Sequence, residues 1–171
     1  MGRAELILVF GAIVIFGIYS LTILDMQLQN RIANINRKYE DAAVSLAHSY
    51  LNMAGNEKFD EHVDSDGKLP PGASFTSPDS LGNESGETDL NSFDDLDDYI
   101  GLSDSTLSIT FYDSDSIIYQ FEVDFSAEYV NLVSGSWTTS ANITNNKKLT
   151  MRINSDYLPS EVVFSRVMSY K

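Results

Sequence analysis

The chain has 171 residues, and its 11 Lys and Arg against 25 Asp and Glu give a formal net charge of −14 at pH 7. This length suffices for one domain with its own core beside a single membrane-length segment. The acidic balance argues against binding to nucleic acid, and against binding to anionic lipid through a basic patch. Because the chain has no cysteine, the sequence excludes a disulfide framework, a thiolate metal site and a thiol nucleophile.

Residues 1–25 contain an uninterrupted apolar run at 6–24 (LILVFGAIVIFGIYSLTIL), which Glu5 precedes. At a rise of 1.5 Å per residue this run spans about 28 Å as a helix, close to the ~30 Å of a bilayer's hydrocarbon core. It is too long for the apolar region of a signal peptide, and no cleavage site of the A-x-A type follows it. The sequence therefore predicts a helix that lies in lipid or packs among copies of itself.

Residues 26–55 continue this helix with an amphipathic pattern. Polar residues fill one face, no proline interrupts residues 1–54, and Gly55 marks the expected end, because glycine readily adopts the left-handed conformation after a helix. We predict one helix of about 50 residues, whose second half covers the apolar face of a folded domain. Its apolar stripe has intervals of mostly three and four residues: Leu28, Ile32, Ile35, Tyr39, Ala42, Leu46, Tyr50 and Met53.

This N-terminal segment resembles that of a mature type IV pilin or pseudopilin, in which a glutamate at position 5 and an apolar helix lead into an amphipathic continuation. Met1, Glu5 and the run at 6–24 match that pattern. The resemblance implies that Met1 and Glu5 are assembly residues, with Glu5 pairing with the amine of Met1 in a neighbouring subunit. A carboxylate in hydrocarbon costs ~3 kcal/mol, which an opposite charge would offset.

Two positions depart from this family pattern, since Met1 stands where most such pilins have phenylalanine and Thr22 stands where most have proline. Without the proline, the sequence leaves open whether the helix melts near Gly11 to Gly17 in a filament. It also leaves open whether Met1 is a processed and methylated end or the initiator. Charge counting does not favour an exported domain, because only Arg3 is basic before the run and three basic residues follow it. The resemblance implies that the domain is exported.

Residues 56–104 form an acidic connection rich in Gly, Pro, Ser and Asp, without sustained periodicity. Carboxylates in a flexible loop suit calcium, although no complete calcium-loop pattern is present. The alternative interpretation is a solvated acidic turn with Phe93, Leu96 and Tyr99 as its buried face. Residues 93–101 (FDDLDDYIG) also resemble a stretch of pilin-like proteins of the mannose-sensitive haemagglutinin type. The calcium candidates are Asp64, Asp66, Asp94, Asp95, Asp97 and Asp98.

Residues 105–171 carry the alternating patterns of short strands joined by tight turns, which are typical of an antiparallel sheet. Residues 113–115 predict a hairpin turn, and the turn-rich residues 134–146 predict a loop. The predicted fold class is α+β, with the long helix packed on this sheet. The expected strands are 106–112, 116–125, 128–133, 149–153 and 162–169.

The sequence shows no pattern for catalysis. Neither His48 nor His62 lies in a zinc-binding spacing, and no nucleophile elbow or phosphate-binding loop is present. We therefore expect a structural protein and not an enzyme. The resemblance implies a subunit of a type IV pilus-like helical filament, held in the inner membrane beside its assembly machinery and then exported to the cell surface. Two alternatives stay open: a minor pseudopilin, and a single-pass anchor that carries an adhesive domain.

Overall fold

The computed structural model describes residues 2–103, 105–111 and 117–170. The chain divides into two compact units, Met1–Tyr39 and Glu40–Lys171. One helix, α1 (Arg3–Ala54), begins in the first unit and ends in the second. The prediction of a single long helix is confirmed. Its backbone is helical through Gly11 and Gly17 in the single chain.

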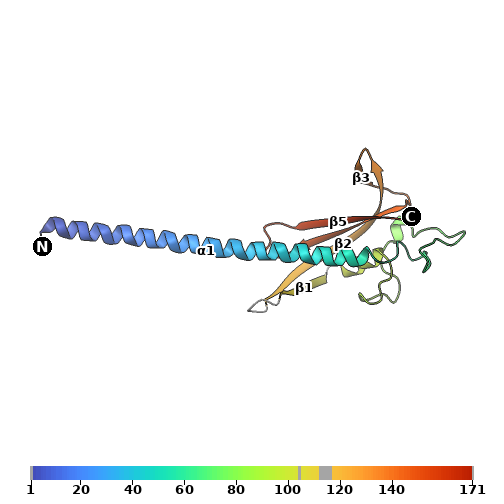
Figure 1. Cartoon of the computed structure of the whole chain (residues 1–171), viewed down its shortest axis with the longest axis horizontal. Helices are drawn as coiled ribbons and strands as arrows, with labels where there is room; N and C mark the ends of the chain where they lie inside the picture. The colour runs from blue at the N-terminus through green and yellow to red at the C-terminus, as the bar shows by residue number, and fades with distance from the viewer. Residues whose placement is uncertain (1, 104, 112–116, 171) are drawn as a thin grey trace. The chain divides into compact units, whose positions relative to one another are not determined.

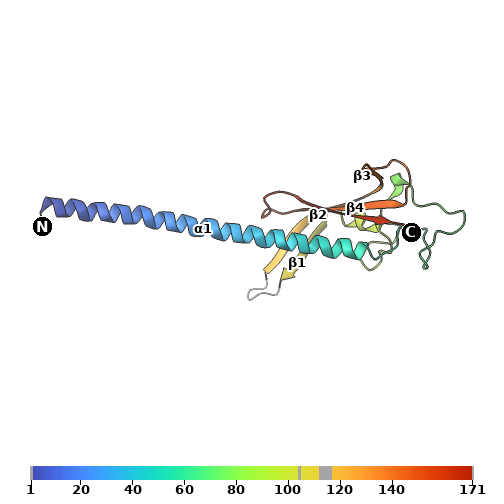
Figure 2. The same ribbon diagram turned by 45° about the horizontal axis from the view of Figure 1, so that its top comes forward.

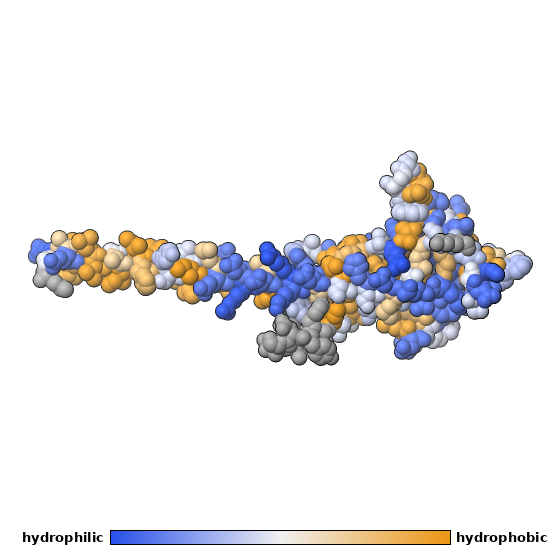
Figure 3. Space-filling view, in the orientation of Figure 1, coloured by the Kyte–Doolittle hydropathy of each residue, from blue (hydrophilic) through white to orange (hydrophobic). Residues whose placement is uncertain are grey.

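The first unit is the N-terminal part of α1, and its large apolar side chains are exposed. Ile15 and Phe16 are 70% and 72% exposed, and Figure 3 shows apolar residues along the start of the helix, followed by hydrophilic ones. The helix is long and apolar enough to cross a membrane. The Thr22 hydroxyl donates to the carbonyl oxygen of Ile18 over 3.0 Å, so this polar group is satisfied inside the helix and tolerates an apolar environment.

In the second unit the last turns of α1 pack on an antiparallel sheet (Figures 1 and 2). Arg166 of the sheet donates from Nη1 to the carbonyl oxygen of Leu51 over 3.2 Å, and so satisfies one of the free carbonyls at the helix end. Gly55 allows this approach, because a Cβ there would lie 2.3 Å from Arg166 Cζ. The helix face that is buried consists of Ala42, Ala43, Leu46, Ala47, Leu51 and Ala54.

This buried face corrects part of the predicted stripe. Ala42 and Leu46 are buried as expected, whereas Met53 is 41% exposed, and Leu28 and Ile32 in the first unit are 58% and 51% exposed. The buried face is made largely of alanines, which are small and are often fully buried. A pattern that gives weight to large apolar residues misplaces such a face.

The sheet has the strand order β1-β2-β4-β5, with every pair antiparallel, and β3 also pairs with β2. Buried side chains alternate with exposed ones along much of β2 and, with the buried side chains of β4 and α1, belong to the core. This confirms the predicted α+β class. The strands are β1 (Ser105–Phe111), β2 (Ile117–Val133), β3 (Ser136–Thr139), β4 (Asn146–Asn154) and β5 (Val162–Ser169).

Two details of the predicted strands are wrong. The strands expected at 116–125 and 128–133 both lie in β2, but no break separates them, because β2 changes partners from β1 and β4 to β3 without interruption. The loop expected at 134–146 contains β3, which follows a two-residue turn. Ser134 and Gly135 both have positive φ, 53° and 84°, as a type I′ hairpin turn requires. The hairpin turn expected at 113–115 lies outside the described residues.

The connection between α1 and β1 contains two short 3-10 helices, η1 (Pro78–Ser80) and η2 (Asp97–Leu102). A second apolar cluster fixes it to the sheet, in which Phe59, Val63 and Phe75 pack around Tyr129 of β2. Tyr170 at the end of the chain also joins this cluster, with its ring 5.0 Å from that of Phe75. The acidic connection therefore has a core of its own.

Candidate functional site

Glu5 lies in the first turn of α1, directly before the apolar run. The backbone N–H of Gly2 donates to Glu5 Oε2 over 3.0 Å, and the N–H of Glu5 donates to the carbonyl oxygen of Gly2 over 3.0 Å. This reciprocal pair caps the helix start, where the helix dipole also favours a carboxylate. Met1, the other predicted assembly residue, lies outside the described residues.

The calcium candidates Asp64 and Asp66 belong to an exposed turn of their own. The backbone N–H groups of Asp66 and Lys68 donate to Asp64 Oδ1 over 3.0 and 2.8 Å. The carboxylate of Asp64 therefore closes the turn. Within the described part of the chain, neither Asp64 nor Asp66 joins the groups of carboxylates that converge.

The other four candidates surround the start of η2. Asp95 Oδ1 accepts the backbone N–H of Asp97 over 2.8 Å. Asp98 Oδ2 accepts the N–H groups of Asp94 and Asp95 over 2.8 and 2.9 Å. Asp94 also forms an ion pair with Lys58. These bonds fix the carboxylates to the backbone and hold the helical turn.

The interpretation of this stretch as a solvated acidic turn is confirmed for its buried apolar face and wrong for its carboxylates. Phe93, Leu96 and Tyr99 are buried, as that interpretation expects. However, Asp95, Asp97 and Asp98 are no more than 1% exposed. Carboxylates are buried only where hydrogen bonds or charges compensate the loss of water, and the backbone bonds of η2 supply part of that compensation.

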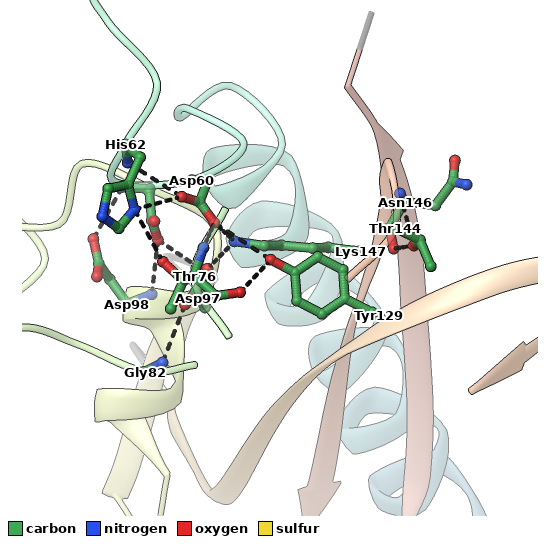
Figure 4. A network of polar contacts seen from close by, with 11 residues as sticks. Asp60, His62, Thr76, Gly82, Asp97, Asp98, Tyr129, Thr144, Asn146 and Lys147 are labelled. Carbon is green, nitrogen blue, oxygen red and sulfur yellow. Dashed lines mark hydrogen bonds and ion pairs between the residues drawn. The ribbon is translucent and has the colours of Figure 1, made fainter. Parts of the chain in front are cut away.

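A buried lysine supplies another part. Lys147 of β4 extends its ammonium group to Asp60 and Asp97, with Nζ 2.9 Å from Asp60 Oδ2 and 2.5 Å from Asp97 Oδ1 (Figure 4). All three side chains are at most 1% exposed. We refer to Lys147, Asp60 and Asp97 as the lysine cluster. It joins the segment after α1, the start of η2 and the sheet.

Backbone groups complete the lysine cluster. Asp60 accepts the N–H of Thr76 over 2.9 Å and the N–H of His62 over 3.2 Å. Asp97 accepts the N–H of Gly82 over 3.1 Å. Each carboxylate therefore fixes a separate part of the connection to Lys147, which explains how a segment with little regular structure is ordered.

The electrostatics of the lysine cluster favour its charged state. Burial by itself opposes ionisation of Asp60, but the hydrogen bond and the charge of Lys147 outweigh it and lower the pKa of Asp60 below the usual 3.8. Burial likewise disfavours the ammonium of Lys147, but the charge of Asp97 and the hydrogen bonds to both carboxylates raise its pKa above the usual 10.5. The cluster is an ion pair with two acceptors.

A second group of carboxylates lacks such a partner. One oxygen each of Glu84, Glu87 and Asp98 lie within 4.8 Å of one another, and we refer to these residues as the acidic trio. Among the described residues, no ion pair involves any of the three. Two of their buried oxygens, Glu84 Oε2 and Asp98 Oδ1, accept no hydrogen bond from the described part of the chain.

The acidic trio therefore resists full ionisation. Burial, a hydrogen bond to Glu87 and the charge of Asp98 raise the pKa of Glu84 to about 8. Burial also raises the pKa of Asp98 above the usual 3.8, although its backbone hydrogen bonds act against this. Neighbouring Asp95 behaves in the same way, because burial and the charge of Asp97 raise its pKa to about 8.

Sequence reasoning missed Lys147, Asp60, Glu84 and Glu87 as site residues. For Lys147 a signal exists. Side chains two residues apart in a strand lie on the same face, so an extension of the predicted strand 149–153 places Lys147 on the buried face with its apolar residues. The acidic residues give no such signal. Their positions depend on contacts between segments that are distant in the sequence.

Comparisons of the chain with protein-family models, with curated proteins and with solved structures found no match. The lysine cluster is neutralised from within the chain, apart from the excess charge of one carboxylate. The acidic trio offers oxygen ligands to a hard cation.

Proposed function

We propose that this chain is the structural subunit of a type IV pilus-like filament, in which the α1 helices of many copies pack together. The observation that carries the proposal is the exposure of the large apolar side chains at residues 6–24, on a helix whose other end packs on a sheet. The α+β arrangement agrees with a pilin-like subunit, and Glu5 stands at the position that the resemblance assigns to assembly.

The exposed part of α1 requires a cover. A large apolar side chain gains about 1.5–3 kcal/mol when it leaves water, so this helix is stable only in lipid or against other apolar helices. Lipid covers it while the subunit is in the membrane. Neighbouring α1 helices cover it in a filament surrounded by water. Because lipid and helix are equally apolar, transfer between them needs a further attraction.

Glu5 supplies that attraction in the proposed assembly. Among the described residues of the single chain, its carboxylate accepts only a local hydrogen bond, from Gly2. In the filament it pairs with a positive charge at the start of a neighbouring helix, the amine of Met1. The pairing offsets the ~3 kcal/mol that a carboxylate in hydrocarbon costs.

The test removes the charge of Glu5 and keeps its shape. We expect Glu5→Gln to reduce the yield of sheared surface filaments at least about tenfold, since 1.4 kcal/mol corresponds to a factor of ten. Immunoblots of membranes should show the subunit at its normal level. Glu40→Gln is the matched control, because Glu40 is an exposed carboxylate of the same helix. Normal filament yield from Glu5→Gln would contradict the proposed role of Glu5 in assembly.

A membrane-anchored binding domain is the second candidate, and the β2–β3 hairpin favours it. Leu132, Val133 and Trp137 on this hairpin are 60%, 53% and 41% exposed, and an exposed apolar group of this kind is typical of a contact surface. Shearing distinguishes the two functions. An anchored domain stays with the membrane fraction, whereas a filament subunit appears in the sheared fraction, where electron microscopy shows filaments.

A further inference from the structure

We propose that the acidic trio of Glu84, Glu87 and Asp98 binds a divalent cation of the calcium type, which fixes the turn at residues 82–87 to η2. This inference is independent of the filament, because every residue that it uses belongs to the second unit. It also differs from the calcium candidates that the sequence indicates, of which only Asp98 takes part.

A backbone turn and a hydrogen bond between two segments bring the three carboxylates together. Between Glu84 and Glu87 the backbone turns, with the N–H of Glu87 3.2 Å from the carbonyl oxygen of Glu84. The N–H of Glu84 donates to Glu87 Oε2 over 2.9 Å. The bond from Gly82 to Asp97 then fixes this turn beside η2, where Asp98 follows Asp97 in the chain.

The burial of Asp98 distinguishes this trio from an ordinary acidic patch. The residue is fully buried, and its carboxylate is held by two backbone N–H groups on Oδ2. Its Oδ1 receives no hydrogen bond from the described residues, and the carboxylate faces those of Glu84 and Glu87. A buried carboxylate that converges with two further carboxylates is stabilised by a cation between them.

The ligand set and its spacing favour calcium. Calcium takes oxygen ligands at 2.3–2.6 Å, so two ligands on opposite sides of one ion are about 5 Å apart. The oxygens of the trio lie within 4.8 Å of one another, so one calcium ion can contact all three. Magnesium keeps several waters and binds fewer carboxylates directly. The trio contains no imidazole or thiolate, which zinc and softer metals prefer.

A neighbouring group of carboxylates strengthens the local field. Glu87 also converges with Glu61 and Asp94 within 4.8 Å, but Lys58 already forms an ion pair with Asp94. The excess negative charge therefore remains on the side of Glu84 and Asp98. A cation there neutralises charge that no side chain of the described residues neutralises.

A shared proton is the competing explanation, because two carboxylates can hold one proton between them. The two explanations differ in their response to calcium and to pH. Bound protons would be released when calcium enters, so the affinity for calcium should increase with pH. With a proton alone, added calcium would change nothing.

The experiment uses the full chain, purified in detergent micelles and treated with a chelator. Calorimetric titration with CaCl₂ should show one saturable binding event per chain, and at a hundredfold excess over the Kd the unfolding temperature should increase by about 5 °C or more. MgCl₂ at the same concentration should have a much smaller effect. If about 10 mM calcium produced neither binding heat nor a shift of the unfolding temperature, the proposal would be overturned, because extracellular sites bind calcium with a Kd of roughly 0.1–1 mM.

Variants locate the site. Asp98→Asn and Glu84→Gln should each weaken calcium binding about tenfold or more, because each removes a charged ligand. Glu87→Gln offers the same test at a partly exposed position, in case a buried variant does not fold. Asp66→Asn is the control, since Asp66 is an exposed carboxylate of the same connection outside the trio. Equal weakening in Asp66→Asn, or unchanged binding in all three trio variants, would contradict the assignment.

Discussion

The lysine cluster and the acidic trio are built from neighbouring residues, yet they solve the burial of carboxylates in different ways. Asp97 and Asp98 are adjacent in η2, and both are at most 1% exposed. Asp97 reaches Lys147, whereas Asp98 faces Glu84 and Glu87. One side of η2 is therefore neutralised from within the chain. The other side depends on what the surroundings supply, either a proton or a cation.

The two groups should therefore differ in the free energy that is lost or gained when one member is removed. Removing one member of a buried ion pair leaves an uncompensated charge and costs several kcal/mol. Removing one member of a group of like charges relieves repulsion. The lysine cluster should therefore determine the stability of the second unit, whereas the acidic trio should make that stability depend on conditions.

The largest expected effect is that of Lys147→Met. Two buried carboxylates would lose their cation, so we expect the free energy of unfolding to decrease by about 3–5 kcal/mol. Lys148→Met is the matched control on the same strand. Lys148 pairs with Glu128 where both side chains are partly exposed, and such pairs contribute about 1 kcal/mol or less. Urea unfolding of the full chain in detergent measures both, and equal effects would contradict the contrast.

The pH dependence of stability should have opposite signs for the two groups. The pKa of Asp60 is lowered, so its contribution is present above the usual 3.8 and is lost as pH decreases below it. The pKa values of Glu84 in the trio and of neighbouring Asp95 are raised to about 8. Their contribution is present below the usual 4.5 and 3.8 and is lost as pH increases towards 8.

Thermal unfolding of the full chain between pH 4 and pH 9 measures this balance. With a chelator present, we expect the unfolding temperature to decrease as pH increases from about 5 to about 8, the interval between the usual and the raised pKa values. Calcium should reduce this decrease, because it replaces the protons of the acidic trio. An unfolding temperature that stays constant across this interval with the chelator would show that the acidic trio is not strained by ionisation.

The smallest expected effect is that of Gly101→Ala, which acts on the turn that carries Glu84. A Cβ at Gly101 would lie 2.9 Å from Asn83 Cγ, so the Asn83 side chain, which donates to the carbonyl oxygen of Glu87 over 2.7 Å, would have to move. We expect a loss of about 1 kcal/mol, since overpacking costs roughly 1–3 kcal/mol and a side chain at the surface can yield. Calcium affinity should decrease, whereas Thr88→Ala, an exposed change beside the same turn, should leave it unchanged.

The long helix and most strands could be predicted because their signals are local. No proline interrupts α1, and β1, β4 and β5 alternate in apolar character, so the predicted strands at 106–112, 149–153 and 162–169 overlap the observed ones. The errors arose where local rules give no preference. The backbone of β2 crosses Ser126 and Ala127 without a break because β4 pairs with both, and β3 exists because a Ser-Gly turn folds it back on β2.

The candidate site could be predicted only in part. Acidic residues near η2 are visible in the sequence, and the apolar face of Phe93, Leu96 and Tyr99 indicates a buried turn. Which carboxylates are buried, and which meet a cation, is not visible. The acidic residues of the connection have similar local composition, so their roles differ only through their partners.

The sequence by itself determined that the first part of α1 must be covered by lipid or by other helices, because the free energy of exposing its apolar run depends on composition alone. It also determined the net charge and the helix and strand periods. Only the tertiary structure decided that Lys147 meets Asp60 and Asp97, which are 87 and 50 residues away in the chain. Electrostatic compensation acts over a few ångströms in space, so the partners of buried charges become defined only when distant segments pack together.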